Sequence, residues 1–201
     1  ATDWGITMAL PVILGSSSVF RAQQLERLGV GFTVAKPVFD ETPLAEESAA
    51  DTALRLAVGK AQSLAVRFPA HLIIGADQVA FCNGEQLGKP MDAANAQRML
   101  ERLSGRRILF YSALCLLNTR SGSLKTHVDE TTVQMRTLSA VQIARYLARE
   151  PDAVYCAGAA KSEGLGAALL ERIDSSDPNA LIGLPVFKLV EFLQDEGVVV
   201  V

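Results

Sequence analysis

Apolar runs and helical patterns alternate along the first third of the chain. A buried strand is expected over residues 11–14, followed by a small-residue turn and a helix that ends at Gly29. A second strand is expected over 31–35. The apolar face that begins after Ser48 predicts a helix to about Arg67. This order is typical of a strand-turn-helix fold.

The middle of the chain contains the most continuous apolar run. Residues 71–75 predict a central strand, and Asp77 is expected just beyond its end. The Asn-Gly pair at 83–84 lies between the short segments 79–81 and 85–87 and predicts a hairpin. Asp92 then caps a predicted helix.

The sequence from residue 108 onward predicts a long two-stranded β-ribbon and two helices. Strands over 108–118 and 124–135 have matching lengths, which favours antiparallel pairing. Ser139 opens a helix that ends before Pro151, and an apolar helix is expected over 186–194. We therefore expect an α/β fold with a mixed sheet, in two lobes that flank a cleft, without a linker between them.

Composition narrows the class of ligand. The chain has 201 residues, 49% of them apolar and 20% charged, as in ordinary globular proteins. A net charge of -3 argues against a nucleic-acid-binding face, and no apolar run is long enough to span a membrane. The expected partner is a small charged molecule. We expect one domain over 8–201, with residues 1–7 as an extended or non-native leader.

The cysteines indicate a reducing compartment. Cys82, Cys115 and Cys156 lie far apart and lack metal-ligand spacing, so all three are expected to be buried free thiols. Because free thiols persist in a reducing compartment, the cysteines predict a cytoplasmic protein.

Two acids and two lysines are candidates for chemistry. Asp77 follows a buried strand, where α/β sheets place ligands; the alternative is a structural cap. Glu41 lies in a loop framed by prolines and could instead be a solvated acid. Lys60 interrupts an Ala-rich helix and Lys89 lies between glycine and proline; both could be ordinary surface lysines. Carboxylates suit a hard cation, and lysines suit the phosphates that it bridges.

An anion site is predicted where the first helix begins. The turn that contains Ser16 and Ser18 points backbone N–H groups and a helix dipole at its ligand, and Arg21 could add a bidentate contact. Simple N-capping by serine is the alternative. His71 and His127 lack metal-ligand spacing, and no GxSxG or Walker-type loop occurs, which argues against serine-hydrolase and P-loop mechanisms.

The clusters in order resemble the Maf family of nucleoside triphosphate pyrophosphatases, from Leu10 to Gly197. The segments that carry the resemblance are Ser16-Ser17-Ser18 to Arg21, Asp40-Glu41-Thr42, Gly75-Ala76-Asp77-Gln78, Gly88-Lys89-Pro90, and Asp177-Pro178-Asn179 to Gly183-Leu184-Pro185. The resemblance implies an inosine-triphosphatase-like mixed sheet with two lobes around a deep cleft, often a homodimer. It also implies hydrolysis between the α- and β-phosphates, assisted by a divalent metal such as Mg²⁺ or Mn²⁺.

The resemblance also implies roles for the candidate residues. Arg21, Lys60 and Lys89 would bind phosphates, together with the serine turn. Glu41 and Asp77 would hold the metal and activate water, with Asp77 as the proton acceptor.

Three positions predict the substrate base. Many relatives have Pro-Arg-Arg after the serines, whereas this chain has an aromatic at Phe20 that can stack on a base. Members that prefer dTTP and UTP tend to carry glutamine where this chain has Glu163, whose carboxylate could accept hydrogen bonds from guanine. With Gln78 as a further specificity residue, these positions resemble the branch that acts on 7-methyl-GTP. Phe20 could instead be a core aromatic, and Glu163 a surface acid.

Other functions remain open at this point. One keeps the reaction but prefers dTTP, UTP or another altered base. A second is a nucleotide-binding regulator of cell division without turnover, and a third is an interaction scaffold. The acids and lysines favour an enzyme, because a pure binder does not need a water-activating acid.

Overall fold

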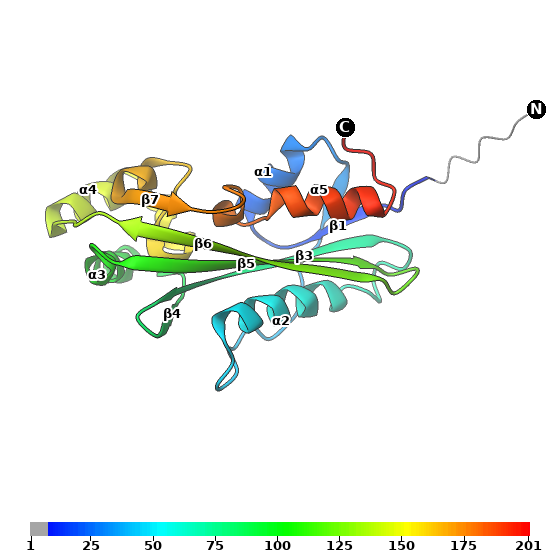
Figure 1. The fold of residues 1–201 in the computed structure, drawn as a ribbon, viewed down its shortest axis with the longest axis horizontal. Helices are drawn as coiled ribbons and strands as arrows, with labels where there is room; N and C mark the ends of the chain where they lie inside the picture. Colours follow the sequence, from blue (N-terminus) through cyan, green and yellow to red (C-terminus); the bar gives the residue numbers. More distant parts are fainter. Residues whose placement is uncertain (1–7) are drawn as a thin grey trace, which may run out of the picture.

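A mixed sheet lies at the centre of the protein, which we describe over residues 8–201 of a computed structural model (Figure 1). The expected leader, residues 1–7, lies outside this range. The strands are β1 (Val12–Gly15), β2 (Phe32–Val34), β3 (Leu72–Cys82), β4 (Glu85–Leu87), β5 (Arg107–Asn118), β6 (Leu124–Met135) and β7 (Leu170–Asp174). The helices are α1 (Val19–Arg27), α2 (Ala49–Gln62), α3 (Ala93–Leu103), α4 (Ala140–Arg149) and α5 (Val186–Asp195). The α/β prediction is confirmed for the described residues, whereas the division into two lobes stays a prediction.

The sheet order is β2-β1-β3-β5-β6-β7, with β4 paired to β3. The first three strands in this order are parallel, and the β3, β5, β6 and β7 pairs are antiparallel. The predicted long ribbon is therefore confirmed as β5 and β6. No helix among residues 8–201 has the length and apolar character needed to cross a bilayer.

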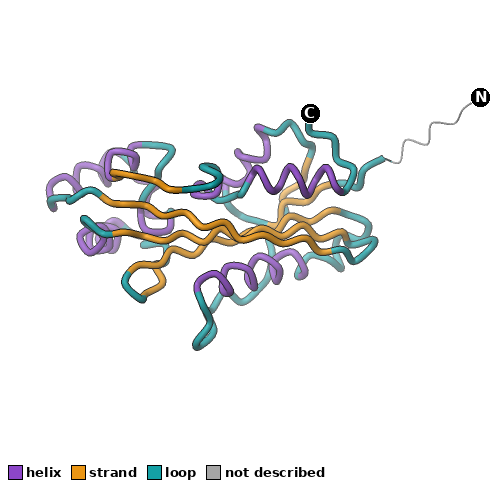
Figure 2. The backbone as a smooth tube through the Cα atoms, viewed as in Figure 1, coloured by secondary structure: helices purple, strands orange, loops and turns teal. Residues whose placement is uncertain are grey.

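Helices cover both faces of the parallel part of the sheet (Figure 2). One face packs its alternate residues against α1 and α5, with Leu25 and Leu189 at the contact. The opposite face packs against α2 through small side chains such as Ala57 and Ala61. Because side chains alternate along a strand, neighbouring residues of β3 enter different layers. A third apolar cluster joins α3 and α4 to the beginning of β5 and the end of β6, which lie side by side because the two strands are antiparallel.

Most predicted ends of elements are confirmed. The Ser139 hydroxyl accepts a hydrogen bond from the Gln142 backbone N–H, and the Gln142 side-chain oxygen accepts one from the Ser139 backbone N–H. Asn83 and Gly84 both adopt positive φ angles, 50° and 83°, as a primed hairpin turn requires. Ser48 and Asp92 also cap the helices predicted for them.

Two predicted boundaries are wrong. The α2 helix ends at Gln62 rather than near Arg67, because the chain tightens into three-residue turns after it. The strand expected over 71–75 continues without a break to Cys82. Asp77 therefore lies inside β3 and not beyond its end.

Candidate active site

The candidate site lies in a gap along one edge of β3. On that edge β1 pairs with β3 only as far as Gly75, and β4 begins to pair at Ala80. Residues 76–79 are paired on the other edge by β5 alone. Asp77 and Gln78 lie in this gap, so their strand is accessible there although it is central elsewhere.

The other predicted segments meet at the same gap because of the topology. The serine turn follows the end of β1, the Glu41 loop follows β2, and Lys89 follows β4. Parallel strands end at the same edge, which brings the first two segments together. The β3–β4 hairpin folds back along β3 and brings Lys89 to the same gap.

A glycine allows α2 to lie close to β3. A Cβ atom at Gly75 would lie 2.1 Å from the Ala57 carbonyl oxygen and 3.0 Å from Cβ of Ala61. Any side chain at this position would therefore push the helix away. The close approach places Lys60 of α2 with its Nζ atom 2.8 Å from Oδ1 of Asp77.

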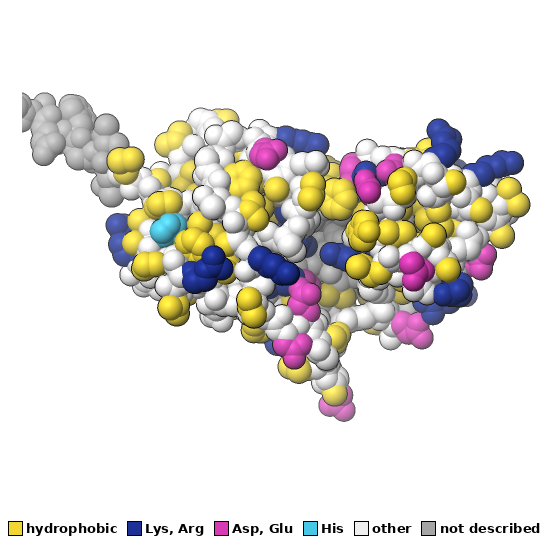
Figure 3. All heavy atoms as spheres, turned by 180° about the vertical axis from the view of Figure 1, so that it is seen from behind, with side chains coloured by type: hydrophobic (Ala, Val, Ile, Leu, Met, Phe, Trp, Pro, Cys, Tyr) yellow, Lys and Arg dark blue, Asp and Glu magenta, His cyan; other side chains and the backbone are white. Residues whose placement is uncertain are grey.

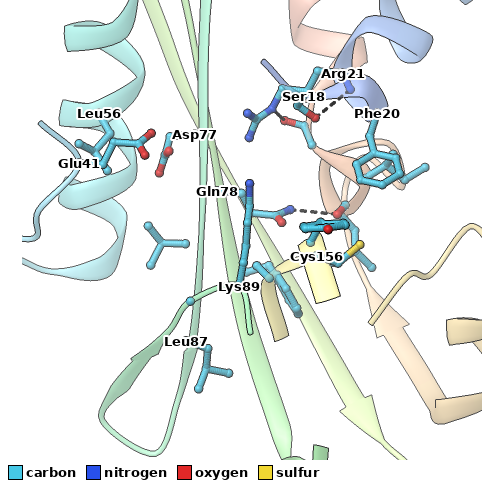
Figure 4. Close-up of a pocket in the computed structure, with 18 of the residues that line it drawn as sticks. Ser18, Phe20, Arg21, Glu41, Leu56, Asp77, Gln78, Leu87, Lys89 and Cys156 are labelled. Atoms are coloured by element: carbon cyan, nitrogen blue, oxygen red, sulfur yellow. Dashed lines mark hydrogen bonds between the residues drawn. The ribbon is translucent and has the colours of Figure 1, made fainter. Parts of the chain in front are cut away.

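Lys60 joins the two candidate carboxylates. Its Nζ atom is 2.8 Å from Asp77 Oδ1 and 2.5 Å from Glu41 Oε1. The side chains of Lys60 and Asp77 are each 11% exposed, whereas that of Glu41 is 61% exposed. Figure 4 shows the Glu41 and Asp77 carboxylates side by side. One acid is thus interior and the other faces the opening.

The surroundings move the pKa values of these two acids in opposite directions. Burial raises the pKa of Asp77, and the nearby Lys60 and Arg21 only partly oppose this rise. Burial also acts to raise the pKa of Glu41, but its hydrogen bond to Lys60, with Lys89 and Arg21, holds the pKa below its usual range. A pair of this kind combines a proton acceptor with an acid that stays ionised.

The loop that carries Glu41 is attached to α2 at two points. The Phe39 ring occupies the space above Gly59, where a Cβ atom would come within 2.5 Å of three ring carbons. Further along the loop, Arg55 donates to the Thr42 carbonyl oxygen at 3.1 Å. Both contacts come from the helix that carries Lys60, so the acid and the lysine are held together.

Arg21 faces these acids from the opposite wall (Figure 4). Its Nε atom donates to the Gly183 carbonyl oxygen at 3.0 Å, and Nη1 donates to Ser16 Oγ at 3.4 Å. Burial lowers its pKa, while Asp77 and Glu41 act to raise it. Ser18 accepts a hydrogen bond from the Arg21 backbone at 3.3 Å, which confirms the alternative that it caps α1. A nucleotide contact from either serine stays a prediction.

Lys89 completes the cationic side of the pocket. As a whole residue it is exposed, but the pocket removes solvent from its ammonium group, which lowers its pKa; repulsion by Arg21 and Lys60 adds to this. The three predicted cations therefore do line one cavity, together with both acids.

Two adjoining cavities form the pocket. Their volumes are about 550 and 1040 Å³, and they share walls made by Phe20, Arg21 and Glu163. Figure 3 shows a hollow between the two ends of the molecule with charged side chains in it. Such volumes suit a small charged ligand.

The predicted base-specificity residues lie at the pocket, but in different settings. Phe20 is half-buried and Glu163 is exposed; both line the two cavities. The Gln78 side-chain amide donates to the Leu181 carbonyl oxygen at 2.9 Å and to the Ala180 carbonyl oxygen at 3.2 Å. Gln78 therefore also fastens the loop that positions Arg21.

The two acids fit a divalent cation whose remaining ligands come from elsewhere. Within residues 8–201, no three His, Cys, Asp or Glu side chains are grouped closely enough to hold a metal alone. The Oδ2 atom of Asp77 is buried without a hydrogen-bond partner, which leaves it available to a ligand. Mg²⁺ is often held by one or two carboxylates with phosphate oxygens and water.

Several residues that shape the site were not found from the sequence. Gly75 and Gly59 matter because of what lies opposite them, which no local pattern reveals. Tyr155 and Cys156 also line the cavity. Cys82 and Cys115 are buried free thiols as predicted, but the burial predicted for Cys156 is wrong because it is partly exposed at the pocket.

Comparisons with known proteins agree with the motifs. The family model described as Maf-like protein matches residues 11–196. A 7-methyl-GTP pyrophosphatase of Neisseria gonorrhoeae is 65% identical over 95% of this chain and 97% of its own length. One from Chromobacterium violaceum is 53% identical over 93% of this chain and 97% of its own length. The resemblance seen in the sequence is confirmed.

Proposed function

This chain belongs to the Maf family, and we propose that it is a nucleoside triphosphate pyrophosphatase that hydrolyses 7-methyl-GTP to 7-methyl-GMP and pyrophosphate. The observation that carries the proposal is Asp77, a buried acid with a raised pKa and a free oxygen, held between cations in an open pocket. The names of the relatives support the choice of substrate.

The two acids and three cations that line the pocket each have a role in the proposed reaction. Asp77 accepts a proton from the water that attacks the α-phosphorus, and the bond from that phosphorus to the bridging oxygen breaks. Arg21, Lys60 and Lys89 bind the phosphates and stabilise the charge on the departing pyrophosphate. Glu41 and Asp77 would hold Mg²⁺ or Mn²⁺, which lowers the pKa of water and neutralises phosphate charge.

The base is recognised at the other end of the pocket. A 7-methylguanine carries a positive charge, which an aromatic face such as Phe20 attracts by about 0.5–2 kcal/mol. Glu163 would accept hydrogen bonds from the N1 and N2 donors, which pyrimidines lack. Gln78 is the third proposed specificity residue, and the serine turn with Ser16 and Ser18 would contact phosphate.

A panel of triphosphates tests this proposal. We expect pyrophosphate release from 7-methyl-GTP to exceed that from GTP, dTTP and UTP in kcat/KM, with a requirement for a divalent metal. Each 1.4 kcal/mol of preference gives about a tenfold difference. Faster turnover of UTP or dTTP would favour the alternative specificity, and binding without turnover would favour a regulatory role.

The basic limb of the pH profile should report on Lys89. Its pKa lies below the usual 10.5, so its charge is lost as pH rises through that lowered value. Triphosphate affinity should therefore begin to fall on the basic side below pH 10.5. The Lys89→Arg variant keeps its charge, so its KM should stay constant to higher pH. Identical pH profiles of KM in the two proteins would contradict this role.

Three broader properties belong to the same proposal. We propose that residues 8–201 act as one domain, that the protein forms a homodimer, and that it acts in the cytoplasm. Family resemblance supports the dimer, and free thiols at Cys82 and Cys115 suit a reducing compartment. Sedimentation equilibrium would detect the dimer.

A further inference from the structure

One carboxylate at the end of α4 fastens the turn that carries Glu163. Glu150 accepts a hydrogen bond from Lys161 Nζ at 3.1 Å through Oε1, and one from the Leu165 backbone at 3.0 Å through Oε2. Glu150 thus holds both ends of the turn. A Cβ atom at Gly164 would lie 2.6 Å from Glu150 Oε2, so the turn is fitted closely around this carboxylate.

The backbone of Lys161 is held independently of its side chain. The Tyr146 hydroxyl accepts from the Lys161 backbone at 3.0 Å and donates to the Ala159 carbonyl oxygen at 2.8 Å. A Cβ atom at Gly166 would lie 2.3 Å from the Lys161 carbonyl oxygen. Changes to the Lys161 or Glu150 charge should therefore leave this part of the loop in place.

The Lys161 ammonium lies next to the proposed base position. Its Nζ atom lies over the Phe20 ring, 5.7 Å from the ring centroid, and is 3.7 Å from Asp152 Oδ2. The hydrogen bond to Glu150 raises the pKa of Lys161, so the ammonium is charged. The carboxylates of Glu150 and Asp152 both contact this ammonium, and the charge of Glu163 also acts to raise its pKa.

A lysine in this position would oppose the proposed substrate if its charge were not neutralised. Guanine presents the N7 and O6 acceptors, to which an ammonium donates well. Methylation at N7 removes one acceptor and adds a positive charge, which an ammonium repels. An unpaired Lys161 would therefore favour guanine over 7-methylguanine.

We propose that Glu150 is a positioning residue for base specificity: by pairing with Lys161 beside the Phe20 ring, it neutralises the ammonium and so lets a cationic base stack on that ring. This inference rests on the proposed function, because it explains how that function would select its substrate. It assigns the selectivity to a contact outside the predicted specificity residues. Glu150 acts through Lys161 and does not itself touch the nucleotide.

The test compares the affinities of 7-methyl-GMP and GMP, measured by titration calorimetry. Glu150→Gln keeps an oxygen for the Leu165 N–H but loses the charge that holds Lys161. We expect the preference for 7-methyl-GMP to fall on the order of fivefold. Lys161→Met should not lower that preference, and the double variant should return to within about twofold of the original value.

A matched control removes a similar lysine–glutamate ion pair away from the pocket, on α5. Glu191→Gln breaks the 2.9 Å contact with Lys188 on α5 and should leave the preference unchanged. If Glu150→Gln leaves the preference intact, or if Lys161→Met fails to rescue it, the inference is overturned. Equal affinity of the original protein for both monophosphates also overturns it.

The binding assay separates this inference from the proposed reaction. Failure of the original protein to release pyrophosphate from 7-methyl-GTP rejects the reaction alone, since monophosphate affinities are measured without turnover. Thermal midpoints of all variants show whether each is folded. If Glu150→Gln does not fold, Lys161→Met still decides: a clear fall in preference would reject the inference.

Discussion

Replacing Asp77 by asparagine is expected to abolish most hydrolysis while the protein remains folded. General-base catalysis contributes about 10²–10⁴-fold, and Asp77 is also proposed as a metal ligand, so kcat should fall by about 10³-fold or more. Burial already disfavours the charged carboxylate, as its raised pKa shows. Asparagine keeps an oxygen for the Lys60 ammonium, so the thermal midpoint should change little. Steady-state pyrophosphate release and thermal unfolding measure the two effects.

Two further measurements make the Asp77→Asn result specific. Asp195→Asn changes an exposed acid at the end of α5 and should leave kcat unaltered. Nucleotide binding to Asp77→Asn should persist, because Arg21 and Lys89 are untouched. Unaltered metal-dependent hydrolysis in Asp77→Asn would show that another group accepts the proton.

The sequence predicts the residues of this site better than it predicts their geometry. Asp77 stands out by its local setting, whereas Glu41 and Lys60 are candidates that could also be surface residues; all three lie in one ion-pair cluster. The position of Asp77 is misjudged because strand length depends on neighbours. β3 continues past the end of β1 because β5 pairs with it along its whole length up to Phe81, a contact between distant segments.

Contacts between layers explain the rest of what the sequence does not reveal. The helical pattern of α2 predicts an apolar face, but not which residue of β3 it meets. A glycine in a strand is commonly attributed to flexibility or a bulge. Gly75 instead serves a packing contact, which becomes visible only when the backbone of Ala57 is placed against it.

Replacing Gly75 by alanine is accordingly expected to cost both stability and activity. The added Cβ would lie 2.1 Å from a backbone oxygen of α2, so no side-chain rotation relieves the contact and the helix must move. Overpacking of this kind costs about 1–3 kcal/mol or more, which for a domain of this size lowers the thermal midpoint by roughly 2–12 °C. Displacement of α2 also separates Lys60 from Asp77, so kcat should fall even at temperatures where the variant is folded.

Gly31→Ala provides the matched control for this change. A Cβ atom at Gly31 meets nothing within 4 Å, and its φ angle is outside the left-handed region, so alanine should be tolerated there without loss. A normal thermal midpoint and kcat in Gly75→Ala would mean that α2 can shift without cost. The approach of this helix to β3 would then not be what fixes the distance between Lys60 and Asp77.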